Sequence, residues 1–242
     1  MLIVGHRGAR NEAPENTLAG FQHLRSLGIH QVELDVRLSK DEQLVVIHDS
    51  TLDRTSNGKG LVRHHASSEL QMLDANAGFK LNQPTPVPTL RQVLDEWPQL
   101  DYIQLEIKSA EVACLEILCR QITRLVMEYQ MMDRAVVTSS DTKVLALMLA
   151  NDARIHRGLV AERFTRNPIQ TCHRYGCSHL VVNHQRCSPR LIQTAQQQGL
   201  IVSVWTVNTL NKAEKLMRWG VDSIITDEPT KMATHFYGSS FA

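Results

Sequence analysis

The sequence has few features that would suit the protein to nucleic acids. Its 242 residues carry a formal net charge of only +1, and aromatic residues make up just 5% of the chain. A chain so close to neutral lacks the electrostatic field that attracts nucleic acids or acidic membranes. So few aromatic rings also disfavour a surface on which bases could stack. We therefore expect no nucleic acid partner, and any bound anion must be held by local groups.

Long apolar runs and paired cysteines are missing as well. No run approaches the roughly 20 apolar residues that cross a bilayer, so we expect no membrane span. The first residues lack the basic start, apolar stretch and cleavage site of a secretory signal. The five cysteines form no Cys-x-x-Cys pair, so their spacing is not that of a zinc site. An odd number of cysteines without a secretory signal favours reduced thiols in the cytoplasm. The oligomeric state stays open.

The sequence does contain an alternation of strand-like and amphipathic helix-like runs, and its apolar content of 43% can bury a full core. The expected strands are residues 2–5, 31–38, 44–47, 102–108, 135–138, 155–160, 180–183, 201–207 and 223–226. The expected helices are a first one that opens at 14–17 and stops at Gly28, and then 89–96, 111–130, 141–150, 165–175, 189–198 and 209–219. This alternation predicts a parallel sheet.

We predict a TIM (β/α)8 barrel that occupies residues 1–242 as one domain. This prediction counts 31–38 and 44–47 as separate barrel strands, although the link 39–43 between them is too short for a helix. Residues 49–86 break the rhythm with turn-forming residues, and we expect a small insertion there after the third strand. An open doubly wound sheet is the alternative, but no Gly-x-Gly-x-x-Gly motif opens a helix.

Three carboxylates stand near the carboxyl ends of expected strands, where the active sites of TIM barrels lie. Glu33 and Asp35 are two residues apart and therefore share one face of a strand, and Glu106 and Lys108 repeat that spacing. Three converging carboxylates would repel one another, so they predict a divalent cation, and oxygen ligands favour Mg²⁺ or Ca²⁺ over zinc. In the alternative interpretation, Glu33 and Asp35 face solvent beside Arg37. Glu106 and Lys108 then form only a structural ion pair.

Two histidines and two cations complete the candidate site. His6 closes the first apolar run, and His48 closes the run at 44–47. Their imidazoles titrate near neutral pH, as a proton-transfer pair requires. Arg7 and Lys108 would neutralise charge that develops on a phosphate. Together these residues predict metal-assisted chemistry on a phosphate. The histidines interpreted as structural are His23, His30, His156, His173, His179 and His235.

These residues belong to a series of stretches that resembles the glycerophosphodiester phosphodiesterase family, in family order. The matching stretches are His6-Arg7-Gly8, Pro14-Glu15-Asn16-Thr17, Glu33-Leu34-Asp35-Val36, His48-Asp49, Leu52-Asp53-Arg54-Thr55 with Gly58 and Gly60, Leu105-Glu106-Ile107-Lys108, Trp205-Thr206-Val207-Asn208, and Gly220-Val221-Asp222 with Thr226-Asp227-Glu228-Pro229. Each stretch is weak alone, but together they are highly specific. Ser56 and residues 74–78 depart from the family pattern, which leaves the shape of the insertion and the leaving-group preference open.

The resemblance implies a TIM barrel that hydrolyses a small glycerophosphodiester to glycerol 3-phosphate and an alcohol. The residue roles that it implies are metal ligation by Glu33, Asp35 and Glu106, acid/base catalysis by His6 and His48, phosphate contacts from Arg7 and Lys108, and places around the site for Glu15 and Trp205. The metal, Mg²⁺ or Ca²⁺, is left open.

The implied mechanism resembles that of phosphatidylinositol-specific phospholipase C, in which a hydroxyl of the substrate attacks phosphorus and water then opens a cyclic phosphate. By analogy, His6 takes the hydroxyl proton and His48 protonates the leaving alcohol. A second enzyme hypothesis keeps the site but changes the substrate to a lysophospholipid, for which the insertion would supply an apolar platform. A non-catalytic phosphodiester-binding protein is the last alternative, and it would be expected to lack a catalytic or metal-binding residue.

Overall fold

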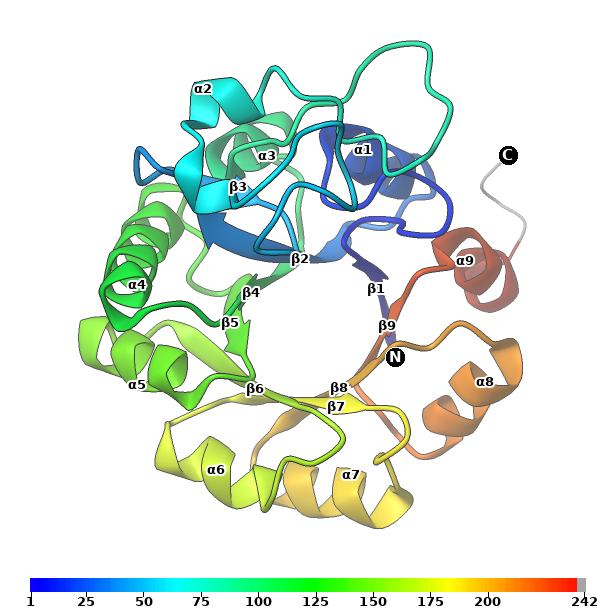
Figure 1. Ribbon diagram of the computed structural model, residues 1–242. Helices are drawn as coiled ribbons and strands as arrows, with labels where there is room; N and C mark the ends of the chain where they lie inside the picture. The colour runs from blue at the N-terminus through cyan, green and yellow to red at the C-terminus, as the bar shows by residue number, and fades with distance from the viewer. Residues whose placement is uncertain (239–242) are drawn as a thin grey trace.

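A computed structural model of the protein describes residues 1–238, and its central feature is a closed barrel of parallel strands surrounded by helices (Figure 1). The barrel strands are β1 (Leu2–His6), β2 (Gln31–Leu38), β4 (Tyr102–Ile107), β5 (Ala135–Ser139), β6 (His156–Ala161), β7 (His179–Asn183), β8 (Ile201–Trp205) and β9 (Ser223–Thr226). Each strand pairs in parallel with the next one of the series, and β1 pairs with both β2 and β9, which closes the sheet. The predicted TIM barrel is confirmed.

The helices form the outer ring of the molecule (Figure 1). They are α1 (Leu18–Ser26), α3 (Leu90–Glu96), α4 (Val112–Glu128), α5 (Thr142–Asn151), α6 (Pro168–Arg174), α7 (Pro189–Gln197), α8 (Leu210–Arg218) and α9 (Pro229–Tyr237), with α2 (Ser67–Leu70) and the 3₁₀ helix η1 (Val62–His64) in the loops after β3. Thr17 caps α1 by accepting a hydrogen bond from the Gly20 amide, as its place before the first apolar turn predicts. None of the helices within residues 1–238 has the length and apolar character needed to cross a bilayer.

The run at 44–47 does not form a barrel strand, which corrects that prediction. β3 (Leu44–Val46) pairs antiparallel with β2 and lies outside the closed barrel. The cause is the short link 39–43, which folds into a tight turn in which the Ser39 amide donates to the Gln43 carbonyl at 3.0 Å. Such a link reverses the chain, whereas a parallel strand needs a long crossover connection.

The segment 49–86 follows β3 as the predicted insertion and consists mostly of loops with the short η1 and α2. Its loops gather on the side of the barrel that carries β2, β3 and α1 (Figure 1). The insertion shares a small apolar core with residues on either side of it, namely Val45, Ile47, Leu52, Val62, Leu70, Ala75 and Val87. It therefore packs on the β2–β3 hairpin and leaves the barrel interior free.

Inside the barrel, a small apolar layer underlies the polar residues of the mouth. It contains Val4 of β1, Val160 of β6, Val181 of β7 and Ile225 of β9, all of them buried. Val4 and His6 are two residues apart, so both side chains point into the barrel, with the imidazole nearer the carboxyl end. The layer provides a dry floor beneath the site.

Candidate active site

The three predicted carboxylates meet at the mouth of the barrel. Glu33 and Asp35 come from β2, Glu106 comes from the neighbouring β4, and the strand register places Asp35 directly beside Glu106. One oxygen of each carboxylate lies within 4.8 Å of the others. Glu33 and Asp35 are buried, with exposed fractions of 3% and 0%. Strand pairing thus brings together acids that are about 70 residues apart in the chain.

Two cations contact these carboxylates, but they neutralise the three negative charges to different degrees. Lys108 Nζ is 2.8 Å from Asp35 Oδ1 and 2.5 Å from Glu106 Oε1, and Arg7 Nε is 3.2 Å from Asp35 Oδ2. Burial alone would raise the pKa of Asp35, but Lys108 and Arg7 hold that pKa well below its usual range. The pKa of Glu33 moves the other way, because burial raises it and the Asp35 and Glu106 carboxylates raise it further.

Glu33 is the acid that the protein leaves uncompensated. Its Oε2 accepts a hydrogen bond from the Arg7 amide at 3.1 Å, but its buried Oε1 has no hydrogen-bond partner within residues 1–238. An unpaired buried carboxylate is costly unless a charge or a metal satisfies it. A divalent cation with a preference for oxygen ligands would supply the missing charge, so the residues of this cluster fit a hard metal ion.

Each of the two predicted histidines forms a pair with an aspartate. His6 Nδ1 lies 2.5 Å from Asp227 Oδ1, and His48 Nδ1 lies 2.6 Å from Asp49 Oδ1. An ionised carboxylate only accepts hydrogen bonds, so each imidazole carries its proton on Nδ1 and keeps Nε2 free as a base. Burial lowers the pKa of His6, although the hydrogen bond that His6 donates to Asp227 opposes this shift. Burial also lowers the pKa of His48, although Asp35 opposes it.

Asp227 is the functional neighbour that sequence reasoning undervalued. Its position directly after the last strand and within the Thr226–Pro229 stretch was the signal in the sequence that could have found it. In the structure, the carboxylate binds His6 through one oxygen and accepts a hydrogen bond from Asn208 Nδ2 at 2.7 Å through the other. Asp227 therefore orients an imidazole that is 221 residues away in the chain.

A cavity of about 120 Å³ opens between these groups. Both histidines, Glu33, Glu106 and the two cations line it, together with Trp205 of β8. Its full lining is His6, Arg7, Glu33, His48, Gln104, Glu106, Lys108, Thr138, Val160, Glu162, Val181, Trp205 and Ile225. The buried Trp205 Nε1 has no hydrogen-bond partner within the described chain, so it can donate to a bound molecule.

Glu15 stands behind the cavity instead of lining it. Its carboxylate accepts hydrogen bonds from Arg7 and Arg54 at 2.9 Å, and from Arg10 at 3.2 Å. Burial would raise the pKa of Glu15, but Arg54 and Arg7 bring it down to about 2. Because Arg54 belongs to the insertion, Glu15 ties the insertion to Arg7 at the barrel mouth.

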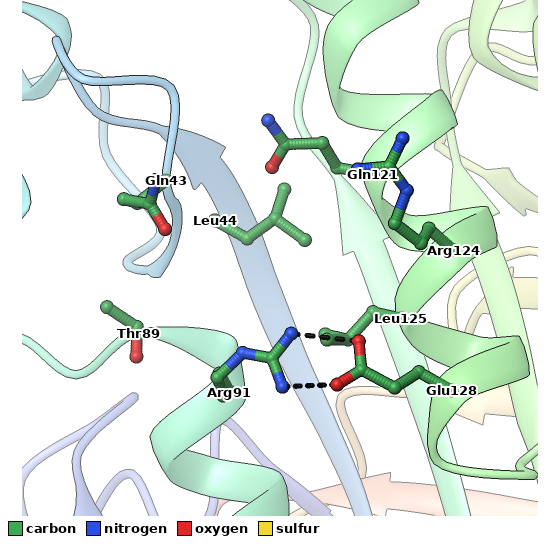
Figure 2. Close-up of a pocket in the computed structure, with 8 residues that line it drawn as sticks. All are labelled: Gln43, Leu44, Thr89, Arg91, Gln121, Arg124, Leu125 and Glu128. Atoms are coloured by element: carbon green, nitrogen blue, oxygen red, sulfur yellow. Dashed lines mark hydrogen bonds and ion pairs between the residues drawn. The ribbon is translucent and has the colours of Figure 1, made fainter.

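A larger hollow, of about 280 Å³, lies on the outside of the barrel between α3 and α4. Figure 2 shows that Arg91 and Glu128 face each other across it through two hydrogen bonds, of 2.6 and 2.9 Å. Its lining contains no histidine, and its single carboxylate is fully paired. Size therefore does not identify the candidate site here, because the two histidines and the uncompensated carboxylate line the smaller cavity.

Comparisons with known proteins find relatives over most of the chain. A family model described as the glycerophosphoryl diester phosphodiesterase family matches residues 6–231. The glycerophosphodiester phosphodiesterase of Caldanaerobacter subterraneus is 32% identical over 232 residues, which cover 94% of this chain and 94% of that protein. The glycerophosphodiester phosphodiesterase of Bacillus altitudinis is 28% identical, with 95% of each chain covered.

Solved structures show the same likeness. A phosphodiesterase from Oleispira antarctica, in complex with the product sn-glycerol-3-phosphate, matches with a TM-score of 0.89 and 27% identity over 97% of both chains. A glycerophosphodiester phosphodiesterase from Agrobacterium tumefaciens matches with a TM-score of 0.85 and 28% identity, covering 97% of this chain and 99% of that one. The protein therefore belongs to the glycerophosphoryl diester phosphodiesterase family, and the prediction of an enzyme of this class is confirmed.

Proposed function

We propose that the enzyme hydrolyses small glycerophosphodiesters to glycerol 3-phosphate and an alcohol, with a divalent metal ion and two histidines in its site. The observation that carries this proposal is the convergence of His6, His48, Glu33 and Glu106 on one cavity of about 120 Å³, with Asp35 in the same carboxylate cluster. That volume suits a phosphate with a short polyol better than a long acyl chain. The product named in the Oleispira antarctica complex supports the same choice.

Glu33, Asp35 and Glu106 would hold the metal ion, either Mg²⁺ or Ca²⁺. When bound, the ion acts as a Lewis acid toward a phosphoryl oxygen and neutralises the uncompensated charge of the acids. Arg7 and Lys108 already lie within 3.2 Å of these carboxylates, so they are placed to share a phosphate that approaches the cluster.

The two histidines support an in-line transfer with an internal nucleophile. The glycerol 2-hydroxyl attacks phosphorus and gives its proton to His6 Nε2, while the bond from phosphorus to the leaving alcohol breaks and His48 Nε2–H gives that alcohol its proton. Water then opens the cyclic phosphate with the two roles reversed, which yields glycerol 3-phosphate. An internal hydroxyl has a high effective concentration, and this advantage explains why the site needs no nucleophilic side chain.

The imidazole environments are consistent with these roles. Burial lowers the pKa of His6, so its neutral imidazole is available as the base near pH 7. His48 acts as the acid from its protonated form, which the Asp35 charge and the Asp49 hydrogen bond favour against the lowering of its pKa by burial. Asp227 and Asp49 fix the Nδ1–H tautomers and stabilise the imidazolium that forms in each half of the reaction. The five cysteines are free thiols, which supports a reducing, cytoplasmic setting.

The test is a coupled assay for released glycerol 3-phosphate with a panel of glycerophosphodiesters, in chelator and after each metal is added back. We expect no turnover in chelator and recovery with Mg²⁺ or Ca²⁺. A diester of propane-1,3-diol, which lacks the 2-hydroxyl, should be almost inert. Normal turnover of that diester would rule out the internal nucleophile, and the absence of glycerol 3-phosphate from every substrate would rule out the proposed reaction.

Lysophospholipids remain a second candidate substrate because the insertion exposes apolar side chains. Met72 is 85% exposed and Leu81 is 43% exposed. Together they could rest against an acyl chain outside the cavity. Comparing lysophosphatidylcholine with glycerophosphocholine in the wild type and in Met72→Ser decides this point. The lipid substrate would be favoured if the wild type hydrolysed lysophosphatidylcholine faster than glycerophosphocholine and if Met72→Ser abolished that difference.

A further inference from the structure

A second pocket begins beside the catalytic cavity and has no role in the reaction described so far. Its volume is about 270 Å³, and it lies between the end of β2, the start of the insertion and the start of α4. Lys108 lines both this pocket and the catalytic cavity, so the two spaces adjoin at the phosphate-binding end. Its remaining wall is mainly aliphatic, with Leu38, Leu61, Val62 and Leu118.

Arg37 gives this pocket a distinctive charge. Its Nε donates to the carbonyl oxygen of His48 at 2.8 Å, which attaches the guanidinium to the loop that carries the catalytic imidazole. Its two terminal amino groups have no hydrogen-bond or ion-pair partner in the described chain, although the side chain is only partly exposed. A guanidinium is always charged and offers a planar fork of donors that fits an oxyanion.

The other cations of the pocket are already paired. Arg63 Nη1 lies 3.0 Å from Glu111 Oε1, and Lys108 is engaged by the acidic cluster. The wall therefore contains three cations and one carboxylate, and Arg37 is the cation among them that has no carboxylate partner in the described chain. No aromatic residue among residues 1–238 lines the pocket, so this part of the chain supplies none of the ring faces that recognise a quaternary ammonium group.

We propose that this pocket receives the leaving alcohol of the substrate, and that Arg37 selects alcohols that carry an oxyanion over cationic ones. The inference rests on the proposed phosphodiesterase function and adds the class of alcohol to it. The place suits this role because Lys108 lines both the pocket and the cavity, and because Arg37 of the pocket donates to the backbone carbonyl of His48, the histidine that we assign to protonate that alcohol. The oxyanion can be a carboxylate or a second phosphate, since a guanidinium binds either one through two parallel hydrogen bonds.

The experiment uses the full-length enzyme with its metal and four glycerophosphodiesters of matched size. Their leaving alcohols are ethanolamine, ethylene glycol, glycolate and 2-hydroxyethyl phosphate, which run from positive to negative charge. We expect kcat/KM to rise along this series. Comparing the glycolate diester with the 2-hydroxyethyl phosphate diester shows whether a carboxylate or a phosphate is preferred. If the ethanolamine diester has a kcat/KM equal to or higher than that of both anionic diesters, the proposal is overturned. This result requires only the wild-type enzyme.

The variant Arg37→Met should lower kcat/KM for the anionic alcohols roughly tenfold or more relative to ethylene glycol, because a charge-assisted hydrogen bond pair is lost. A structural role through the His48 carbonyl would lower all four rates together and leave their ratios unchanged, which contradicts the proposal. Arg37→Lys should keep part of the preference. Arg124→Met removes an arginine from the outer hollow of Figure 2 and is the matched control, expected to change no ratio.

Failure of the inference and failure of the proposed function give different results. An enzyme that hydrolyses all four diesters at similar rates is a glycerophosphodiesterase whose pocket does not select charge. An enzyme that hydrolyses none of them contradicts both the proposed function and the inference.

Discussion

The outer hollow and the catalytic cavity both contain cations that face carboxylates, but the charges are matched differently. In the hollow, Arg91 meets Glu128 one to one through two hydrogen bonds, and the two side chains are 53% and 47% exposed. Beside the cavity, a cluster of three carboxylates faces Lys108 and Arg7, and Glu33 Oε1 is buried without a partner in the described chain. The first pair satisfies itself, whereas the second cluster is satisfied only when something binds. An unmatched buried charge is therefore the better marker of function here.

The largest effect is expected from removing the imidazoles of the cavity. His6→Ala and His48→Ala should each lower kcat by roughly 10²- to 10⁴-fold, the range that a positioned acid or base contributes. Metal binding should persist, because neither imidazole belongs to the acidic cluster. The control is His173→Ala, an exposed histidine on α6 that hydrogen-bonds Gln198. Undiminished turnover in His6→Ala would refute the acid/base assignment.

The next largest effect is expected from a glutamate-to-glutamine substitution in the carboxylate cluster, compared with the same substitution in the outer ion pair. Glu33→Gln should weaken metal binding and lower activity by roughly a hundredfold or more, because a direct ligand exceeds the effect of an outer-sphere partner. The metal-free variant should unfold at the same or a higher temperature than the metal-free wild type, since a poorly compensated buried acid is gone. Calorimetric metal titration and thermal melts measure both quantities.

Glu128→Gln is the matched control for that experiment, and it should leave metal affinity and kcat unchanged. If Glu33→Gln bound the metal as tightly as the wild type, the carboxylate cluster would not be the metal site. A strong loss of stability in metal-free Glu33→Gln would instead show that the acid is structurally required.

A smaller effect is expected when an orienting aspartate is neutralised. Asp227 raises the pKa of His6 through its hydrogen bond and its charge, against the larger lowering by burial. Asp227→Asn removes this support, so the pKa of His6 falls further and the acidic limb of the kcat/KM profile moves to lower pH. We expect a loss of roughly ten- to a hundredfold in kcat, as for other partners that orient a reactive group. An unchanged acidic limb would mean that His6 is not the group that titrates.

The contribution of Glu15 should appear in stability as the pH falls. Its pKa of about 2 lies below the ordinary value near 4.5, so its stabilisation is complete above about pH 4.5 and disappears as the pH falls toward 2. Such a shift corresponds to roughly 3 kcal/mol. Urea unfolding at pH 7 and pH 3 should show that Glu15→Gln loses less stability between these values than the wild type. Equal losses would show that the Arg7 and Arg54 contacts contribute little.

The smallest effect concerns the outer ion pair itself. Arg91→Met should change the free energy of unfolding by less than about 1 kcal/mol, because both partners are about half exposed and screened by solvent. Activity should stay at the wild-type level. A change of kcat in this variant would show that the outer hollow is coupled to the barrel mouth, and the contrast between the two clusters would no longer hold.

Much of the fold was predictable because strand and helix periodicities are local. The two-residue spacing of Glu33 and Asp35 placed both acids on one strand face before any pairing was known, and the strand register then set Glu106 beside Asp35. The prediction for 44–47 was wrong because an apolar run does not reveal the direction in which a strand pairs. Direction depended on the turn at 39–43.

The sequence by itself determined the alternation of strands and helices, the polar residues at the strand ends and the family to which they belong. Only the tertiary structure decided that Asp227 orients His6, that Glu15 supports Arg7 from behind, and that Arg37 lines a second pocket without a carboxylate partner in the described chain. The physical reason is that backbone periodicity is carried by neighbouring residues, whereas desolvation and charge pairing depend on which strands meet when the barrel closes.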